Sequence, residues 1–272
     1  MAKRCKIFGG KGTAQHTGIV RRLGTSLACM IAFIFPSFNG GLNARSQDCT
    51  PALPGLVAWW TAEATANDLV NGNDGILKGR ASYTAGEVGY AFDFDGTNGT
   101  VVVPDSPSLR LTNELTIEAW INTTSTNIIQ AIVSKVSIES GDHGYQFVLV
   151  GNELVGQFNG PGQPWPSYLV RCPVSISLGT WNHVAWTYDQ SAMALYLNGD
   201  VILRTIIGPR TIAVTRSNLR ISGADDHDFF RGQVDEPCIY NRALSSAEIK
   251  AIYNAGMAGK CLPEGGPKQK TK

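Results

Sequence analysis

FFRGQVDEPCIYNRALS, residues 229–245, joins the last predicted strand of the chain to its one predicted helix. Apolar and aromatic residues bounded by turn residues favour a strand over Gln233–Tyr240. Ser245 precedes Glu248 by three residues, the spacing of a capping box at a helix N-terminus, and Gly256 can end that helix. Three apolar residues recur at helical spacing within it: Ile249, Ile252 and Tyr253. The stretch therefore predicts a strand followed by one short amphipathic helix.

Upstream of this stretch, short apolar segments alternate with Gly, Asn, Asp, Ser and Pro, which is typical of strands joined by turns. Ten more strands are predicted: Gly55–Trp60, Tyr90–Phe94, Thr100–Val103, Thr116–Ile121, Ile128–Lys135, Tyr145–Val150, Asn182–Tyr188, Ala194–Leu197, Val201–Thr205 and Leu219–Ser222. The Asn198-Gly199 pair predicts a type I′ hairpin, because both central positions of that turn need a positive φ. An all-β sandwich of this length is commonly one domain, so we expect a single domain.

The first 44 residues carry the features of a secretory signal. Six Lys or Arg residues without an acid precede the apolar run Leu27–Phe35, and a small and polar segment ends at Ala44. The run is shorter than the roughly 20 residues that span a bilayer. We expect residues 1–44 to direct secretion to the extracellular space or the cell envelope and to be removed; an uncleaved anchor is the alternative. Residues 45–261 would form the domain, and residues 262–272 a disordered tail.

Charge and cysteine content limit the classes of partner. Without the six basic residues of the signal, the formal net charge falls from +1 to about −5. Nucleic-acid binding needs concentrated positive charge, so we do not expect it. Four cysteines remain in the domain, an even number that predicts two disulfides with three possible pairings: Cys49, Cys172, Cys238 and Cys261. No two of them have the C-x-x-C spacing of a zinc or redox site.

An ordered series of motifs over about residues 55–256 resembles the LamG-like family of concanavalin A-like lectin/glucanase domains. The motifs are Gly55–Trp60, Asp68 with Asn71–Gly75, Tyr90–Gly96, Val103–Leu109, Leu115–Ile121, Gly179–Ala185, Leu195–Gly199 and Val234–Glu236. The resemblance implies an all-β fold, a two-sheet antiparallel jelly-roll sandwich with one short C-terminal helix. Relatives by fold include both lectins and glycoside hydrolases, so the fold does not choose between binding and catalysis.

The expected fold suggests one disulfide pairing. The first and last strands of a jelly roll lie side by side, and Cys49 and Cys261 bracket the domain, so we expect them to be bonded. Cys172 with Cys238 then follows by elimination. Cys238 departs from the family pattern, which supports a disulfide particular to this chain.

Catalysis is not expected from the acidic residues. A hydrolase of this fold would carry its carboxylates on one strand in an E-x-D-x-E pattern, about 5 Å apart. Glu118 stands alone in its strand, and the adjacent Asp235 and Glu236 are predicted to face opposite sides of theirs. The Gln-x-His motif of alginate-type lyases is absent as well. We therefore predict no catalytic residue and no enzyme; a glycoside hydrolase or polysaccharide lyase is the least favoured alternative.

Calcium is the predicted cofactor, in a structural role. Related jelly rolls often carry such an ion, and this chain offers hard oxygen ligands in four residues: Asp93, Asp95, Asn98 and Asp235. The alternative is that Asp95 only caps the turn at Gly96.

The predicted ligand platform is Trp165, in the Pro-rich segment Gly160–Tyr168, where a large ring is hard to bury. Four residues near it complete the candidate site: Tyr168, Asn159, Gln163 and Arg171. The alternative is that Trp165 packs as a plug over the end of the sandwich. We predict a secreted, non-catalytic module that binds a polysaccharide or glycan. An extracellular protein–protein interaction or envelope module of laminin G type is the second hypothesis.

Overall fold

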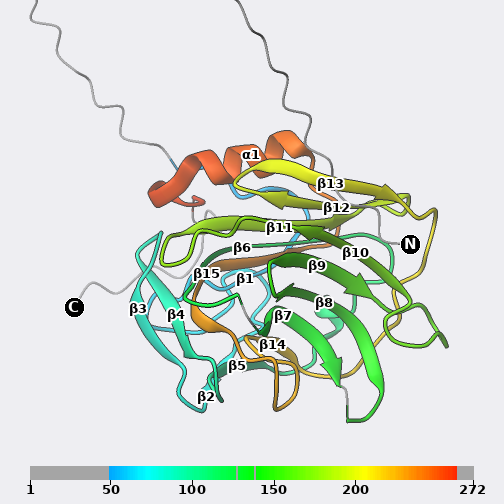
Figure 1. The fold of residues 1–272 in the computed structure, drawn as a ribbon, viewed down its shortest axis with the longest axis horizontal. Helices are drawn as coiled ribbons and strands as arrows, with labels where there is room; N and C mark the ends of the chain where they lie inside the picture. Colours follow the sequence, from blue (N-terminus) through cyan, green and yellow to red (C-terminus); the bar gives the residue numbers. More distant parts are fainter. Residues whose placement is uncertain (1–48, 127, 138, 262–272) are drawn as a thin grey trace, which may run out of the picture. The chain divides into compact units, whose positions relative to one another are not determined.

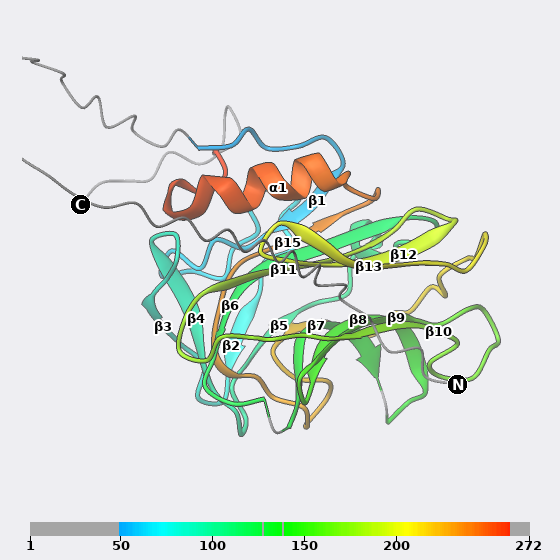
Figure 2. The same cartoon turned by 45° about the horizontal axis from the view of Figure 1, so that its top comes forward.

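The computed structural model describes residues 49–126, 128–137 and 139–261. The predicted signal segment and the predicted C-terminal tail lie outside this range. Two antiparallel β-sheets pack face to face, with one helix, α1 (Ser246–Ala255), on the outer side of one sheet (Figures 1 and 2). The expected fold, an antiparallel jelly-roll sandwich with one short C-terminal helix, is confirmed.

The sheet beneath α1 has eight strands. In spatial order they are β13 (Asp200–Ile206), β12 (Ala192–Leu197), β11 (Asn182–Tyr188), β6 (Leu115–Thr123), β15 (Arg231–Tyr240), β4 (Tyr90–Asp95) and β3 (Ser82–Ala85), and β1 (Leu56–Trp59) also pairs with β15. The hairpin between β12 and β13 turns at Asn198 and Gly199, whose φ values are 51° and 78°. The predicted type I′ hairpin thus has the two positive φ values that it requires.

The opposite sheet has seven strands. In spatial order they are β10 (Tyr168–Pro173), β9 (Glu153–Phe158), β8 (Asp142–Val150), β7 (Ile129–Ser137), β14 (Leu219–Ile221), β5 (Thr100–Val103) and β2 (Ile76–Lys78). Two short 3-10 helices, Pro107–Leu109 and Gly256–Ala258, lie outside the sheets. An observed strand coincides with each predicted one, but β2, β3, β9 and β10 were not predicted.

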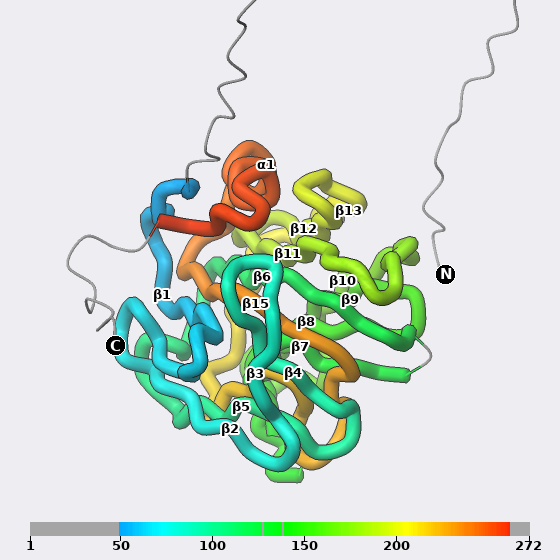
Figure 3. The backbone as a smooth tube through the Cα atoms, turned by 90° about the vertical axis from the view of Figure 1, so that its left-hand side faces the viewer, coloured from blue at the N-terminus to red at the C-terminus, as the bar shows by residue number. Residues whose placement is uncertain are grey.

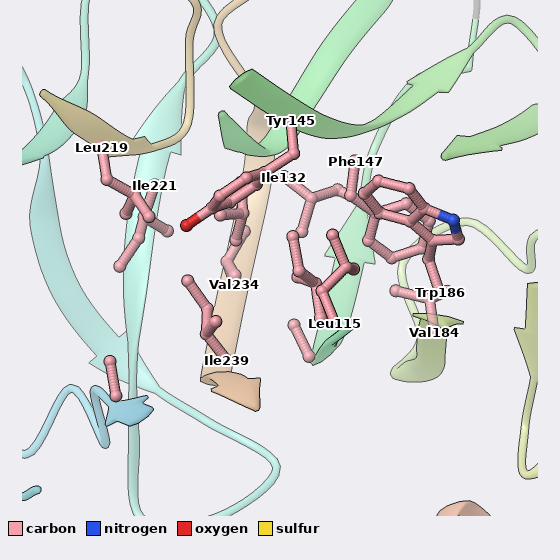
Figure 4. Close-up of a cluster of buried hydrophobic side chains, with 14 of the residues drawn as sticks. Leu115, Ile132, Tyr145, Phe147, Val184, Trp186, Leu219, Ile221, Val234 and Ile239 are labelled. Atoms are coloured by element: carbon pink, nitrogen blue, oxygen red, sulfur yellow. The ribbon is translucent and has the colours of Figure 1, made fainter. Parts of the chain in front are cut away.

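The main core fills the space between the two sheets (Figure 4). Phe147 of β8 packs on Trp186 of β11, with ring centroids 6.3 Å apart. Gly156 of β9 lies under the same indole, and a Cβ at this position would be 2.4 Å from a Trp186 ring carbon. Only glycine therefore fits here without a shift of the strand, and this glycine in mid-strand weakened the sequence signal for β9.

A second apolar cluster lies between the eight-stranded sheet and α1. Ser245 and Glu248 form the predicted capping box, and Gly256 caps the C-terminal end. Ile249 and Ile252 are buried in this cluster, so the predicted apolar face does contact the sheet. In the described part of the chain, no helix has the length and apolar character needed to cross a membrane.

The two ends of the domain are joined covalently. Cys49 and Cys261 form a disulfide with a Cα–Cα distance of 4.9 Å, as predicted. The adjacent Thr50 and Lys260 form a parallel bridge, in which Thr50 N donates to Gly259 O (2.9 Å) and Cys261 N donates to Thr50 O (2.7 Å). Figure 3 shows the blue and red ends of the domain side by side.

The predicted Cys172–Cys238 disulfide is wrong. Cys172 lies in β10 of the seven-stranded sheet and packs in the core between the sheets, with its Sγ 3.8 Å from Ile202 O. Cys238 lies in β15 of the other sheet and is buried on the side of α1. Elimination failed because a buried thiol packs like a small apolar side chain and needs no bonded partner.

Candidate functional site

The candidate site lies on the outer face of the seven-stranded sheet. Five consecutive register partners form a row across it: Arg220 (β14), Ser134 (β7), Gln146 (β8), Gln157 (β9) and Leu169 (β10). Tyr145 and Phe147 point into the core, so Gln146 between them points outward, because side chains alternate along a strand. Paired residues share a face, so the whole row faces outward.

A groove of about 230 Å³ runs over this face, and we call it the sheet groove. Its lining residues are Ile129, Gln146, Val148, Val150, Val155, Gln157, Trp165, Leu169, Arg171 and Asp228. Val148 and Val155 are cross-strand partners and form a small apolar cluster with Ala131, separate from the core. The groove thus combines an apolar floor with amide, aromatic and charged side chains, the composition expected of a site for a polar ligand with apolar faces.

Two amides lie side by side in the sheet groove. Gln157 Nε2 donates a hydrogen bond of 2.7 Å to Gln146 Oε1. This bond fixes both side chains. It leaves the side-chain nitrogen Nε2 of Gln146 and the side-chain oxygen Oε1 of Gln157 for other partners. A neighbouring donor and acceptor can bind two adjacent hydroxyl groups of one ligand.

Trp165 stands at the edge of the sheet groove, in the loop between β9 and β10. Its ring stacks on that of His143 in β8, with centroids 4.8 Å apart and planes at 14°. Asn159 holds the loop, since its Nδ2 donates to Gln163 O (2.9 Å) and its Oδ1 accepts from Ser167 Oγ (2.6 Å). One face of the indole is thus covered by His143, while the Trp165 side chain lines the groove. The ring is half-buried against His143 and is not part of the inter-sheet core.

The other predicted platform residues are distributed over three environments. Arg171 is exposed in the sheet groove and bonds Glu153, with Arg171 Nε 2.8 Å from Glu153 Oε2. Asn159 and Gln163 line a neighbouring hollow of about 520 Å³, which we call the rim cavity. Tyr168 packs toward the core on Phe158, with centroids 5.1 Å apart. The structure therefore brings Trp165 and Arg171 together in one groove, and does not place Tyr168 there.

Three residues of the site were not predicted from the sequence: Gln146, Gln157 and His143. Gln157 belongs to a strand that was not predicted, and the pairing of Gln146 with Gln157 follows only from that strand. His143 lies just upstream of the predicted segment Tyr145–Val150. The sequence signal for β9 was weak, because Leu154 and the outward Val155 are consecutive apolar residues and Gly156 follows them.

Two of the four predicted calcium ligands belong to one turn. Asp95 Oδ1 accepts hydrogen bonds from the backbone nitrogens of Thr97 (2.9 Å), Asn98 (3.1 Å) and Gly99 (3.3 Å). Desolvation disfavours the charged carboxylate, but these bonds and one from the Thr97 hydroxyl outweigh it and lower the pKa of Asp95. Asn98 Oδ1 accepts from Arg80 N (2.9 Å). Asp95 thus caps its turn, as the alternative interpretation predicted.

The other two predicted ligands lie elsewhere. Asp93 accepts a hydrogen bond from Gln233 Nε2 (2.9 Å). Asp95 pairs with Arg231 of β15, and Asp235 lies four residues further along that strand. Asp235 is buried and accepts a hydrogen bond from Val88 N (2.8 Å). Within residues 49–126, 128–137 and 139–261, no group of three or more His, Cys, Asp or Glu side chains is arranged to hold a metal ion. These four residues therefore do not fit one calcium site, and calcium binding stays a prediction.

A buried charge cluster lies under α1, on the other sheet. Lys260 Nζ is 3.1 Å from Glu118 Oε1 and 3.0 Å from Glu236 Oε2, and Glu118 Oε2 is 3.1 Å from His183 Nε2. The prediction that Asp235 and Glu236 face opposite sides is wrong. A bulge between Asp235 and Cys238, with φ of 56° at Glu236, turns Glu236 toward the side of Glu118.

Burial and the neighbouring charges act in opposite directions on the pKa values of these acidic side chains. Desolvation disfavours the charged form of Glu118, but Lys260 and His183 outweigh it and lower the pKa of Glu118 to about 2. Desolvation raises the pKa of Asp235 to about 8. The Glu118, Glu236 and Lys260 side chains are at most 2% exposed, so a substrate has no access to these carboxylates in this structure.

The sequence matches a family described as the concanavalin A-like lectin/glucanases superfamily over residues 95–250. No curated protein matches. Among solved structures, one similar structure is domain 4 of AbnA, a GH43 extracellular arabinanase from Geobacillus stearothermophilus, in complex with arabinotriose. The TM-score is 0.57 and the sequence identity 20%, and the match covers 72% of this chain and 96% of that one.

Two toxin binding domains are similar as well. The binding domain of Paraclostridial Mosquitocidal Protein 1 has a TM-score of 0.58 and 18% identity, covering 74% of this chain and 52% of that one. The binding domain of Botulinum Neurotoxin DC, in complex with SialylT, has a TM-score of 0.59 and 16% identity, covering 74% and 51%. This chain thus spans about half the length of these two domains, and at such identities the likeness shows a shared fold.

Proposed function

The chain belongs to the concanavalin A-like lectin/glucanases superfamily, and on that basis we propose that it is a non-catalytic module that binds a polysaccharide or glycan in the sheet groove. The observation that carries the proposal is the convergence of Trp165 with the Gln146–Gln157 pair in one open groove. A sugar ring has an apolar face, which stacks on an indole, and hydroxyl edges, which bond amides.

Two features of the structure support this proposal over a purely structural role for Trp165. His143 covers one face of the indole and fixes its plane before any ligand binds. The Asn159 bonds fix the loop that carries it. A site whose groups are already ordered loses less conformational entropy on binding. The arabinotriose and SialylT complexes of the similar structures agree with a sugar ligand but do not identify one for this chain.

We also propose that the protein acts outside the cytoplasm. The Cys49–Cys261 disulfide supports this, because such bonds persist in oxidising compartments. A protein partner is the second candidate function. It is favoured by Ile128 and Ile129, which are 40% and 46% exposed in the hollow next to the sheet groove.

The test is a polysaccharide and glycan array with the full chain, run with calcium and again with EDTA. We expect saturable binding to one sugar class, lost in Trp165→Ala and weakened in Gln157→Ala. Tyr90→Ala is the matched control, because Tyr90 is an aromatic residue 51% exposed on the other sheet. The EDTA series tests the calcium prediction separately. Binding that is equal in Trp165→Ala and the parent chain would refute the groove as the site.

A further inference from the structure

A further open hollow, next to the rim cavity, contains two arginines, and we call it the arginine pocket. Its volume is about 340 Å³. Its lining is polar except for Val136: Val136, Ser137, Ser140, Asp142, Arg216, Ser217, Asn218, Arg220 and Asp225. Arg220 is half-buried and belongs to the same outward row as Gln146 and Gln157. The pocket thus opens on the face that carries the sheet groove.

The two arginines have no ion-pair partner among the described residues. None of the ion pairs formed within residues 49–126, 128–137 and 139–261 includes Arg216 or Arg220. Next to Arg220 in the row, Ser134 has a buried hydroxyl without a hydrogen-bond partner in the same part of the chain. A half-buried guanidinium has five N–H donors and no acceptor, so it favours a ligand that brings negatively charged oxygens.

The two acids of the arginine pocket are engaged by other groups. Asp142 Oδ2 accepts from Arg216 N (2.9 Å), Ser217 N (3.1 Å) and Ser217 Oγ (3.1 Å). Asp225 Oδ2 accepts from Glu139 N (3.2 Å) and Ser137 Oγ (3.3 Å). These bonds hold one oxygen of each carboxylate, Oδ2, against backbone N–H groups and serine hydroxyls. The pocket thus holds two carboxylates, each bound through one oxygen, beside two guanidinium groups whose N–H donors have no carboxylate partner in the described part of the chain.

Hydrogen bonds from Lys135 and Asp105 hold the segment that carries Arg216. The buried Lys135 donates through Nζ to Ser217 O (2.7 Å) and to Asp105 Oδ1 (2.7 Å). Asp105 N donates to Asn218 Oδ1 (3.2 Å). Together with the Asp142 bonds, these contacts hold the backbone on both sides of the Arg216 side chain. The backbone on this side of the pocket is thus held without a ligand, as a specific site requires.

The arginine pocket adjoins the rim cavity, which borders the candidate sugar site through His143. Asp142 lines both the arginine pocket and the rim cavity. The next residue, His143, also lines the rim cavity and stacks on Trp165 of the sheet groove. One extended ligand can therefore contact Trp165 and the two arginines at the same time.

We propose that the arginine pocket binds an anionic substituent of the polysaccharide held in the sheet groove, so that the ligand is an acidic polysaccharide. This inference rests on the proposed function. Carboxylate, sulfate and phosphate groups share the required chemistry, two or more charged oxygens that pair with the N–H fork of a guanidinium. A neutral polysaccharide would leave both arginines unpaired.

The test compares polymers that differ in charge. Polygalacturonate, dextran sulfate, a phosphorylated dextran and uncharged dextran are titrated against the full chain. The variants are Arg216→Gln/Arg220→Gln, Trp165→Ala, and the charge-matched control Arg80→Gln/Arg204→Gln. We expect tighter binding to at least one charged polymer than to dextran. The Arg216→Gln/Arg220→Gln variant should weaken it by roughly 10- to 100-fold, while the control stays within about threefold, the loss expected of exposed charges.

The outcomes separate this inference from the proposed function. If Trp165→Ala abolishes binding and Arg216→Gln/Arg220→Gln matches the parent chain, the anionic subsite is wrong and the sheet groove stands. If only the arginine variant loses binding, the subsite stands and the role of Trp165 is wrong. Equal affinity for dextran and for all three charged polymers, or no binding to any, overturns the inference. Thermal unfolding of each variant confirms that it is folded.

Discussion

Lys260 Nζ lies 3.0 Å from Glu236 Oε2, and both side chains are 2% exposed. The same ammonium contacts Glu118 Oε1 at 3.1 Å and lies over the Trp59 ring, 5.3 Å from its centroid. One lysine near the end of the domain therefore pairs with two carboxylates from two neighbouring central strands, β6 and β15. Each of these charges would be costly to bury alone.

Replacing Lys260 with Met should destabilise the domain strongly. The change leaves Glu118 and Glu236 buried without their cation, and breaking such a pair costs about 3–5 kcal/mol. Lys250→Met is the control, because Lys250 pairs with Asp200, whose side chain is 74% exposed, and that pair should contribute less than about 1 kcal/mol. Denaturant unfolding measures both. Equal losses in the two variants would show that Lys260 stabilises the buried cluster no more than Lys250 stabilises an exposed pair.

Asp235 should make the domain less stable as the pH rises. Desolvation raises the pKa of Asp235 from 3.8 to about 8. The folded state therefore holds this proton more tightly than the unfolded state does. The associated stability is fully present below pH 3.8 and is lost as the pH rises to about 8. The free energy of unfolding of Asp235→Asn should fall less between pH 5 and pH 8 than that of the parent chain. If the free energy of unfolding changed with pH by the same amount in Asp235→Asn and in the parent chain, the assigned role of Asp235 would be wrong.

Reduction of the Cys49–Cys261 disulfide should lower the unfolding temperature. The bond joins residues separated by 212 positions, and closing a loop of this size contributes about 5 kcal/mol in the chain-entropy model. Thermal unfolding with and without dithiothreitol measures the loss. The Cys49→Ser/Cys261→Ser variant should unfold at the temperature of the reduced parent chain and should not respond to the reductant. A further decrease in the unfolding temperature of that variant on addition of dithiothreitol would point to a second disulfide.

His143→Ala should weaken sugar binding without changing the fold. His143 is a positioning residue, since it stacks on Trp165. An aromatic pair of this kind is worth about 0.5–1.5 kcal/mol, so the lost ordering of the indole should lower the affinity by at most about 2- to 12-fold. His143→Phe should restore most of the loss, because a phenyl ring can stack in the same way. His227→Ala, at a side chain 49% exposed, is the control. Loss of affinity in the Phe variant equal to that in the Ala variant would refute the positioning role.

Gly156→Ala should disturb the core and the sheet groove together. The new Cβ would lie 2.4 Å from the Trp186 ring, and overpacking of this kind costs about 1–3 kcal/mol. The neighbouring Gln157 would move with the strand, so affinity should fall as well. Val155→Ala, on the outer face, removes groove surface without a clash. If Gly156→Ala unfolds at the temperature of the parent chain, the contact with Trp186 is looser than the structure shows.

The sequence predicted those parts of the fold whose signal is local. The Ser245–Glu248 capping box and the Asn198-Gly199 turn each depend on a few adjacent residues, and both are present in the structure. The site was only partly predictable. Trp165 stood out because its Pro-rich loop disfavours burial. Gln146 and Gln157 could be paired only after the register of β8 and β9 was known, and β9 itself was hidden by Gly156.

Both wrong predictions concern features that depend on how the strands are arranged in space. The placement of Glu236 depends on a bulge in β15, and a one-residue irregularity of this kind has no clear sequence signature. The Cys172–Cys238 prediction assumed that an even number of cysteines must all pair. Cys172 and Cys238 lie in different sheets, which only the strand order reveals.

The position of β15 has a consequence for how the chain is made. This strand pairs with β6, β4 and β1, all of which precede it by more than one hundred residues. Among the described elements, β15 is the last strand of the domain. During synthesis, the middle of the eight-stranded sheet therefore stays open until nearly the whole domain has emerged. Unpaired strand edges invite association with other chains. The nascent protein should accordingly depend on protection by chaperones until residues 231–240 arrive and close the sheet.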